Sequence, residues 1–293
     1  MSDVGPARGY EERRVFVVGA DGTLGSRLVT AFEHQGKSVW GSTRNRTTAG
    51  GKRVFLDLAD NGDHFALPFS GAGAAILCAA NTSIEQCQRE PHATRRVNVE
   101  NTVALAKNLV DAGLFVVFLS SNTVFDGLTA YPGARDKPNP QHEYGRQKAD
   151  AEAQLLDLGN STAVIRFSKI IAPDMPLLRG WIADMRAGKS VYPFSDAVMA
   201  PLSVAFATEL ICRVATSKRA GVTQASASND ISYAGAAKYI ATKIRADMNL
   251  VKPVSCKNAG ISAFPDHTTL DTMELQELGL EAPSPTHVLD QLF

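Results

Sequence analysis

Three glycines at regular spacing place the strongest constraint on the fold of this chain. Gly19, Gly22 and Gly25 stand three residues apart, directly after the apolar run 15–18 and before the amphipathic stretch 24–35. Glycine can take a positive φ in a tight turn and lets another group come close to the backbone. The spacing therefore predicts a strand, a glycine-rich turn and a helix, with the turn at the helix N-terminus.

Short apolar runs continue to alternate with longer amphipathic stretches through the first half of the chain. Strands are predicted over residues 15–18, 39–41, 54–58, 74–79, 115–119 and 162–167. Helices are predicted over 24–35, 91–112 and 144–158, and the second of these ends before Gly113, a C-cap residue. The alternation is typical of parallel strands joined by crossover helices, and it predicts an α/β fold with a doubly wound parallel sheet of the Rossmann type.

The pattern changes after Phe167, where prolines become frequent and clear strand signals become fewer. The prolines concerned are Pro173, Pro176, Pro193 and Pro201. Helices are still indicated over 205–215 and 233–248, and residues 222–225 are a candidate strand that returns to the main sheet. We therefore predict a dinucleotide-binding domain over residues 1–166 and a smaller substrate-binding lobe over residues 167–293.

Charge and cysteine usage exclude several classes of function. Lys and Arg number 30 and Asp and Glu number 30, so no net field favours nucleic acid or an anionic membrane. The four cysteines are far apart and no His cluster has metal-ligand spacing, which favours reduced thiols and no metal site. Residues 1–14 lack the apolar stretch of a secretory signal, and no run approaches the roughly 20 apolar residues of a membrane span. A cytoplasmic location is the resulting expectation.

The glycine turn also has the features of a phosphate site. Backbone N–H groups at a helix N-terminus bind a diphosphate when no Cβ stands in the way. We interpret Gly19 to Gly25 as a dinucleotide cradle, with Asp21, Thr23 and Leu24 among its contacts. A plain glycine-rich turn is the alternative, but the agreement of strand, spacing and helix favours the cradle.

The end of the second predicted strand indicates which dinucleotide binds. NAD-binding chains usually carry an acidic residue there, hydrogen-bonded to the ribose hydroxyls. Here the segment 41–46 reads Gly-Ser-Thr-Arg-Asn-Arg and contains no carboxylate. The guanidinium groups of Arg44 and Arg46 and two hydroxyls, that of Thr43 among them, suit a 2′-phosphate and favour NADP(H). A solvated basic loop is the alternative.

Tyr144 and Lys148 stand four residues apart at the start of a predicted helix, so their side chains share one face. An ammonium near a phenol favours the phenolate and is expected to lower the pKa of Tyr144 from about 10. Such a pair is common by chance. It gains weight from residues 119–127, which read Leu-Ser-Ser-Asn-Thr-Val-Phe-Asp-Gly at the end of the fifth strand. Catalytic residues collect at the carboxyl ends of parallel strands.

Together these motifs resemble the extended short-chain dehydrogenases/reductases, most closely the dTDP-4-dehydrorhamnose reductase branch. The G-x-x-G-x-x-G spacing, Ser-Ser-x-x-Val-Phe-Asp-Gly at 120–127 and Tyr-Gly-x-x-Lys at 144–148 carry the resemblance. Further matches are Glu90-Pro91, Arg-Val-Asn-Val at 96–99, Leu270-Asp271-Thr272 and Leu278-Gly279-Leu280. The resemblance therefore runs over nearly the whole chain.

The resemblance implies roles for individual residues. Ser121 matches the hydroxyl residue that binds the substrate carbonyl, Tyr144 the general acid, and Lys148 the residue that holds the nicotinamide ribose. Asn98 matches the helix asparagine that anchors a water in the proton relay, with a cap or an amide satisfied in the core as the alternative. An ordinary strand-end hydroxyl is the alternative for Ser121.

The same resemblance extends the cofactor site beyond the glycine turn. Asp57 and Leu58 would lie beside the adenine ring, and Ala79 and Ala80 would line the cofactor after the fourth strand. Tyr144 and Lys148 would contact its nicotinamide end. If the alignment at the fifth strand is shifted by one residue, Ser120 or Thr123 would replace Ser121.

The substrate side departs from the family. The branch commonly has an Asp-Tyr pair where this chain has Asn122-Thr123, and often an aromatic residue after the sixth strand, where this chain reads Ser168-Lys169. Arg179, Trp181 and Lys189 are candidates to grip a diphosphate and a base, with surface and core roles as the alternative.

The implied function is NADPH-dependent reduction of a carbonyl on a nucleotide-activated keto-sugar, by hydride transfer with Tyr144 as the general acid. An epimerase or a dehydratase on the same scaffold is one alternative. A non-catalytic NADP-binding protein is another, because the regulatory subunit of methionine adenosyltransferase resembles the same branch and works by contacting a partner. Relatives frequently dimerise through the helices that precede and contain the Tyr-Lys motif, so the analogy implies a homodimer.

Overall fold

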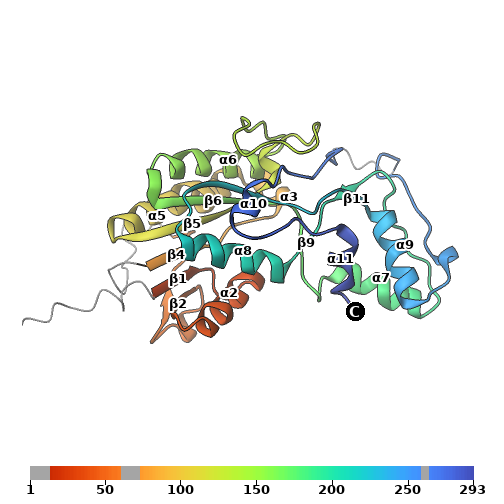
Figure 1. The fold of residues 1–293 in the computed structure, drawn as a ribbon, viewed down its shortest axis with the longest axis horizontal. Coiled ribbons are helices and arrows are strands. Elements are labelled where there is room, and N and C mark those ends of the chain that lie inside the picture. Colours follow the sequence, from red (N-terminus) through yellow and green to blue (C-terminus); the bar gives the residue numbers. More distant parts are fainter. Residues whose placement is uncertain (1–13, 61–72, 259–263) are drawn as a thin grey trace, which may run out of the picture. The chain divides into compact units, whose positions relative to one another are not determined.

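A seven-stranded sheet lies at the centre of the first of two units into which the chain divides (Figure 1). This computed structural model describes residues 14–60, 73–258 and 264–293. In their lateral order the strands are β10 (Gly221–Ala225), β6 (Thr162–Phe167), β5 (Leu114–Ser121), β4 (Gly73–Leu77), β1 (Arg14–Val18), β2 (Ser38–Thr43) and β3 (Arg53–Phe55). The β5–β4, β4–β1, β1–β2 and β2–β3 pairs are parallel. The strand order reverses between β1 and β4, so the predicted doubly wound α/β fold is confirmed.

The two units are not continuous in sequence. The first comprises residues up to 124, 138–166 and 208–223, and the second comprises 125–137, 167–207 and 224 onward. The chain changes unit after Arg166, next to the predicted domain limit, but also at four other points. Residues 1–13, which were expected to lack a signal sequence, lie outside the described residues.

Helices of the first unit connect the parallel strands. They are α2 (Thr23–His34), α3 (Ile84–Arg89), α4 (Pro91–Arg95), η2 (Arg96–Glu100), α5 (Asn101–Asp111) and α6 (Glu143–Leu156), with short turns η1 (Arg46–Thr48), η3 (Asn122–Val124) and η4 (Gly159–Ser161). α8 (Val204–Ser217) leads back toward β10. The apolar faces of α5 and α6 pack on the sheet, where Phe16, Leu105 and Phe118 are fully or almost fully buried. This core fixes the strand ends that carry the candidate site.

The helix predicted over 91–112 is interrupted by a π-turn. At η2 the backbone hydrogen bonds widen from the α-helical to the π pattern, and α5 begins after it at Asn101. The Thr102 hydroxyl donates a 2.7 Å hydrogen bond to the Val97 carbonyl, which helps to satisfy the widened turn. Asn98 and Val99 are both buried in this turn.

Helices surround a separate apolar core in the second unit. Its helices are α7 (Pro176–Arg186), α9 (Tyr233–Ile244), α10 (Glu274–Glu277) and α11 (Pro285–Asp290), with the turn η5 (Met248–Leu250). Two short sheets pair β7 (Ile170–Ile171) with β9 (Leu202–Ser203) and β8 (Val198–Met199) with β11 (Ile231–Ser232). Trp181, Met185 and Ile240 lie in the core.

Several predicted element limits differ from the structure. The strands predicted over 54–58 and 74–79 end at Phe55 and Leu77. The helix predicted over 233–248 ends at Ile244, because Arg245 takes a left-handed conformation with φ 57°. No helix in the described part of the chain is both long enough and apolar enough to cross a bilayer.

Candidate functional site

The glycine turn between β1 and α2 has the geometry that requires glycine. Gly19 takes φ +86°, and a Cβ there would lie 2.8 Å from the backbone nitrogen of Ala79. A Cβ at Gly25 would lie 2.1 Å from the carbonyl oxygen of Gly19, to which Gly22 donates a 3.1 Å hydrogen bond. The turn can therefore close only with residues that lack a Cβ at both positions.

The outer side of this turn fits a diphosphate. Gly22 is exposed, and a Cβ there would meet only the Gly19 carbonyl oxygen, at 3.4 Å. α2 begins at Thr23, and no side chain of the described residues caps its first-turn N–H groups. Leu24 is partly buried, whereas Asp21 is exposed and forms a 3.0 Å ion pair with Arg53. Free N–H groups beside a glycine are the donors that a phosphate anion needs.

The end of β2 forms a compact turn that presents two arginines. Thr43 is buried, and its hydroxyl accepts a 3.0 Å hydrogen bond from the backbone of Asn45. Arg46 stacks over the Phe55 ring, with its guanidinium carbon 3.7 Å from the ring centroid, and lies 3.9 Å from an oxygen of Asp60. Arg44 is exposed. The turn thus carries exposed cations, as the expected 2′-phosphate site requires, although the Thr43 hydroxyl is already engaged.

The segment after β3 is anchored to α5. Leu58 is buried in the main core, and its carbonyl accepts a 2.8 Å hydrogen bond from the side chain of Asn101. Asp57 is partly buried and accepts a hydrogen bond from the backbone of Ala59. Contacts of Asp57 and Leu58 with an adenine ring therefore stay a prediction.

The loop after β4 approaches the glycine turn and is held from the other side by Asn98. Ala79 donates a 3.1 Å backbone hydrogen bond to Val18, and Ala80 follows it, partly buried. Asn98 accepts a 2.8 Å hydrogen bond from the backbone nitrogen of Asn81 and donates a 2.9 Å bond to the same residue's carbonyl. The Asn98 side chain thus pairs with both the backbone N–H and the backbone carbonyl of Asn81.

Tyr144 and Lys148 lie one turn apart on α6, and both are buried. Their exposed fractions are 9% and 4%. The Lys148 ammonium donates a 2.8 Å hydrogen bond to the Leu119 carbonyl and lies 4.4 Å from the Phe118 ring centroid and 5.9 Å from the Tyr144 ring centroid. Burial lowers the pKa of Lys148 to about 8, against a smaller opposing effect of Glu152.

The expected lowering of the Tyr144 pKa is wrong for this structure. Burial raises the pKa of Tyr144 well above its ordinary value, and Cys87 raises it further. Lys148 is not among the causes of this shift, although its ammonium lies 5.9 Å from the Tyr144 ring centroid. The sequence places the two residues on one face but does not reveal how deeply α6 is buried.

Three hydroxyls at the end of β5 differ in their partners. Ser121 accepts a 3.2 Å hydrogen bond from the Thr123 backbone and donates to the side chain of Asn122 at 3.3 Å. The buried hydroxyl oxygens of Ser120 and Thr123 have no hydrogen-bond partner within the described ranges. The choice of Ser121 over the two alternative hydroxyls therefore stays a prediction.

α6 contacts the end of β5 directly. A Cβ at Gly145 would lie 2.2 Å from the Thr123 carbonyl oxygen and 2.9 Å from the Cβ of Pro140. The glycine of the Tyr-Gly-x-x-Lys motif is therefore needed for packing, because only a residue without a Cβ lets the helix approach this closely.

Sequence reasoning missed two buried polar groups on α6. Gln147 is fully buried and accepts a 2.8 Å hydrogen bond from Asn98. Glu152 forms a bidentate ion pair with Arg166 of β6. Helical spacing could have revealed both residues, because Gln147 and Glu152, three and eight positions after Tyr144, lie on the same side of the helix.

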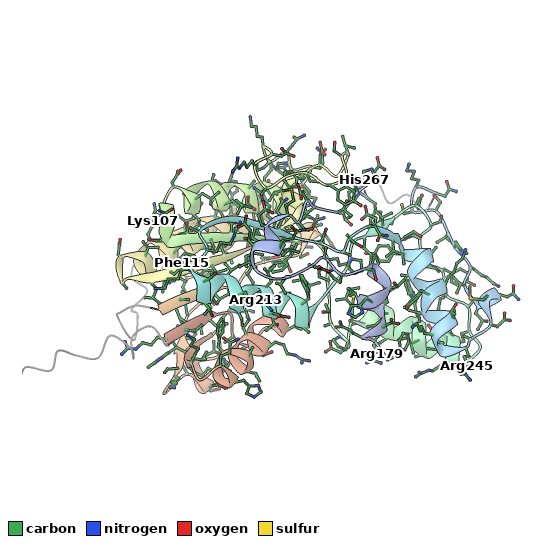
Figure 2. The ribbon with its side chains drawn as sticks, viewed as in Figure 1. Lys107, Phe115, Arg179, Arg213, Arg245 and His267 are labelled. Atoms are coloured by element: carbon green, nitrogen blue, oxygen red, sulfur yellow. The ribbon has the colours of Figure 1, made fainter. Side chains whose placement is uncertain are left out.

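The three substrate candidates of the C-terminal half have different environments. Arg179 is exposed on α7 and donates a hydrogen bond to the Pro173 carbonyl (Figure 2). Trp181 is a core residue that packs edge-on against Tyr233, with ring centroids 6.4 Å apart. Lys189 is exposed. Within the described residues, no group of three or more His, Cys, Asp or Glu side chains could hold a metal ion.

Several solved structures share this fold. A dTDP-4-dehydrorhamnose reductase from Bacillus anthracis in complex with NADP superposes with a TM-score of 0.81 at 21% identity, over 96% of this chain and 98% of that one. UDP-glucose 4-epimerase from Thermotoga maritima with UDP-glucose gives a TM-score of 0.73 at 16% identity, over 95% and 96%. At these identities the comparison establishes the shared fold.

Two curated relatives are similar in sequence. Methionine adenosyltransferase 2 subunit beta from Bos taurus is 30% identical over 154 residues, which are 53% of this chain and 46% of the relative. The match therefore spans about half the length of that protein. A probable low-salt glycan biosynthesis reductase, Agl14, from Haloferax volcanii is 29% identical over 204 residues, which are 64% of this chain and 65% of the relative.

A family comparison covers almost the entire chain. The family described as RmlD substrate binding domain matches residues 13–291, a range that includes both units and all of the candidate site. The resemblance to the extended short-chain dehydrogenases/reductases inferred from the glycine turn and the Tyr-Lys pair is confirmed by this match and by the fold. The chain belongs to the RmlD substrate binding domain family.

Proposed function

We propose that this protein is an NADPH-dependent reductase that converts a carbonyl of a nucleotide-activated keto-sugar to an alcohol. The observation that carries the proposal is the buried pair of Tyr144 and Lys148 one helical turn apart, with the Lys148 ammonium fixed by the Leu119 carbonyl. Buried titratable groups at the carboxyl end of a parallel strand are typical of active sites.

The reaction divides between the cofactor and this chain's side chains. When bound, NADPH supplies a hydride to the carbonyl carbon. Tyr144 donates its hydroxyl proton to the carbonyl oxygen, so the C=O double bond becomes CH–OH. The raised pKa of Tyr144 keeps the phenol protonated at neutral pH, as a general acid requires. Ser121 binds the same oxygen and stabilises its developing charge.

The cofactor assignment rests on the glycine turn and on the cations after β2. The exposed Gly22 and the first turn of α2 would hold the diphosphate, and Arg44 and Arg46 would bind a 2′-phosphate. Lys148 would hold the nicotinamide ribose with its ammonium. Structures of the same fold were solved with NADP and with NAD, so the fold supports a dinucleotide, and the choice of NADP depends on the two arginines. We assign the substrate contacts to the smaller C-terminal lobe predicted over residues 167–293.

An enzyme on nucleotide-sugars is favoured by one curated relative and by solved structures of the same fold. The Haloferax relative is described as a reductase, and the epimerase of the same fold was solved with UDP-glucose. Epimerisation or dehydration on this scaffold would regenerate the cofactor, whereas reduction consumes it.

The decisive experiment measures NADPH consumption with a panel of nucleotide-linked keto-sugars. We expect oxidation of NADPH by the wild-type protein, loss of turnover in Tyr144→Phe, and NADPH binding within about threefold of wild type in that variant. Tyr192→Phe is the matched control, because Tyr192 is exposed. Turnover by Tyr144→Phe at the wild-type rate would refute the role of Tyr144. A changed sugar with no net NADPH loss would identify an epimerase or a dehydratase.

A second function is favoured by one observation, the 30% identity to a methionine adenosyltransferase subunit. In that case the chain would bind NADP and act by contacting a partner. A stable complex with a methionine adenosyltransferase catalytic subunit, together with no NADPH oxidation over the whole panel, would support this function over the reductase.

A further inference from the structure

Gln147 lies inside the Tyr-Gly-x-x-Lys motif and faces away from solvent. Its side chain is 0% exposed, and it stands between Tyr144 and Lys148 on α6. A buried amide must have its hydrogen bonds made within the protein. Its partners therefore show what this residue holds together.

The amide of Gln147 contacts three separate segments. Its oxygen accepts a 2.8 Å hydrogen bond from Asn98 in the π-turn. Its nitrogen lies 3.0 Å from the Thr94 hydroxyl, 3.2 Å from the Pro91 carbonyl and 3.0 Å from a carboxylate oxygen of Glu143. α6 is thereby tied to α4 and to the π-turn through one side chain.

The backbone of Asn81 determines the orientation of both amides. Because the Asn81 N–H donates and its carbonyl accepts, the Asn98 oxygen must face the nitrogen and the Asn98 amino group must face the carbonyl. The amino group of Asn98 then points its second hydrogen at Gln147, whose oxygen must face it. A single arrangement satisfies the whole network.

This network connects the two halves of the candidate site. Asn81 lies two residues after Ala79, whose backbone nitrogen packs against the Gly19 turn. At the other end, Gln147 is the residue immediately before Lys148. An unbroken series of contacts thus runs from the glycine turn through Ala79, Asn81 and Asn98 to the helix that carries the Tyr-Lys pair.

We propose that Gln147 is a positioning residue that holds α6 in register with the loop at residues 79–81 and so sets the distance between Tyr144 and the bound nicotinamide. The chemical part of this inference rests on the proposed reductase function. The structural coupling between Gln147 and Asn81 does not, and it has its own measurement.

Hydrogen exchange at the Asn81 amide tests the coupling. Gln147→Leu keeps a similar volume and removes the partner of Asn98, so Asn81 should exchange about tenfold faster than in wild type. Exchange in the interior of β4, at Ile76, should change less than about threefold, which separates a local release from global destabilisation. Gln154→Leu is the matched control, since Gln154 is exposed on the same helix.

A conservative variant and the kinetics complete the test. Gln147→Glu keeps an oxygen toward Asn98 but sets its second oxygen against the Glu143 carboxylate, so it should restore the Asn81 protection only at a pH low enough to protonate the new carboxyl group. In Gln147→Leu we expect kcat to fall about tenfold to hundredfold while the KM for NADPH stays within about threefold, because misplaced reacting groups slow the chemical step.

The outcomes separate the two levels of the inference. Asn81 exchange that is equal in wild type, Gln147→Leu and Gln154→Leu would overturn the coupling. Faster Asn81 exchange with an unchanged kcat would overturn the positioning role while leaving the reductase function standing. A wild-type protein without any turnover, with Asn81 released in Gln147→Leu, would support the coupling and overturn the proposed function.

Discussion

Replacing Glu152 with Gln should destabilise the first unit more than any exposed charge substitution on α6. The Glu152 and Arg166 side chains are 2% and 3% exposed, and their atoms lie 2.7 Å apart at the closest approach, with two further contacts of 3.1 Å. Taking away the carboxylate leaves the guanidinium buried without an anion. Breaking such a pair costs about 3–5 kcal/mol, a large part of the roughly 5–15 kcal/mol stability of a typical domain.

Urea unfolding followed by the fluorescence of Trp40 measures this cost, with all variants made in a Trp181→Phe background because Trp181 lies in the core of the second unit. Trp40 packs against the main core of the first unit and so reports on the unit that contains the ion pair. Asp150→Asn is the matched control, because Asp150 lies on the same helix as Glu152 but forms an exposed ion pair, 2.6 Å long, with Arg95 of α4. Exposed pairs contribute about 0–1 kcal/mol to stability. The double variant Glu152→Leu with Arg166→Met removes both charges and should lose about 1 kcal/mol or less.

Two results would refute this reasoning. One is a loss below about 1 kcal/mol in Glu152→Gln, which would mean that water or another group compensates Arg166. The other is a double variant that loses as much as the single one, which would place the cost in packing instead of in an unpaired charge.

Three further perturbations test the site. Gly25→Ala should lower both the unfolding temperature and the affinity for NADPH, because the new Cβ would lie 2.1 Å from a carbonyl oxygen. Gly180→Ala is the control and should not lower the unfolding temperature, because a Cβ there would meet open space. Equal behaviour of the two variants would contradict the packing argument. The pKa of Lys148 is about 8 in the folded protein and 10.5 ordinarily, so the unfolded chain binds more protons between these two pH values. As the pH rises through this window, the free energy of unfolding of the wild type should increase by up to about 3 kcal/mol relative to that of Lys148→Met, as measured by urea unfolding. A difference between the two proteins that stays constant with pH would contradict this. Replacing Arg44 and Arg46 with Ala should weaken NADP about tenfold or more in a fluorescence titration and leave NAD unchanged; equal losses for both would argue against a 2′-phosphate site.

The sequence was sufficient to predict the sheet because its signals are local. An apolar run followed by a glycine turn and a helix is recognisable from residues 15–35 alone. α7 was missed because Pro176 looked like a helix breaker, although proline is well tolerated at the first helical position, where this one lies. A proline therefore indicates the end of a helix when the helical pattern precedes it and the start of a helix when the pattern follows it.

The placement of Tyr144 and Lys148 on one helix face could be predicted from their spacing, but their electrostatics could not. The pKa of Tyr144 moves in the direction opposite to the expectation. Burial is a property of everything that packs around the phenol, including segments distant in sequence, and no spacing rule contains it. The π-turn at Asn98 was hidden for a similar reason, because it is supported by bonds to Asn81 and Gln147, which are 17 and 49 residues away.

The missing Cβ of Gly145 has a consequence for how such motifs are read in other chains. Because a Cβ at this glycine would lie 2.2 Å from the Thr123 carbonyl oxygen, any other residue is expected to destabilise the packing of α6, whether or not the protein turns over a substrate. A descendant that had abandoned chemistry altogether would still carry it. Within this motif the glycine is required by packing, whereas the phenol and the ammonium are required only by the proposed chemistry.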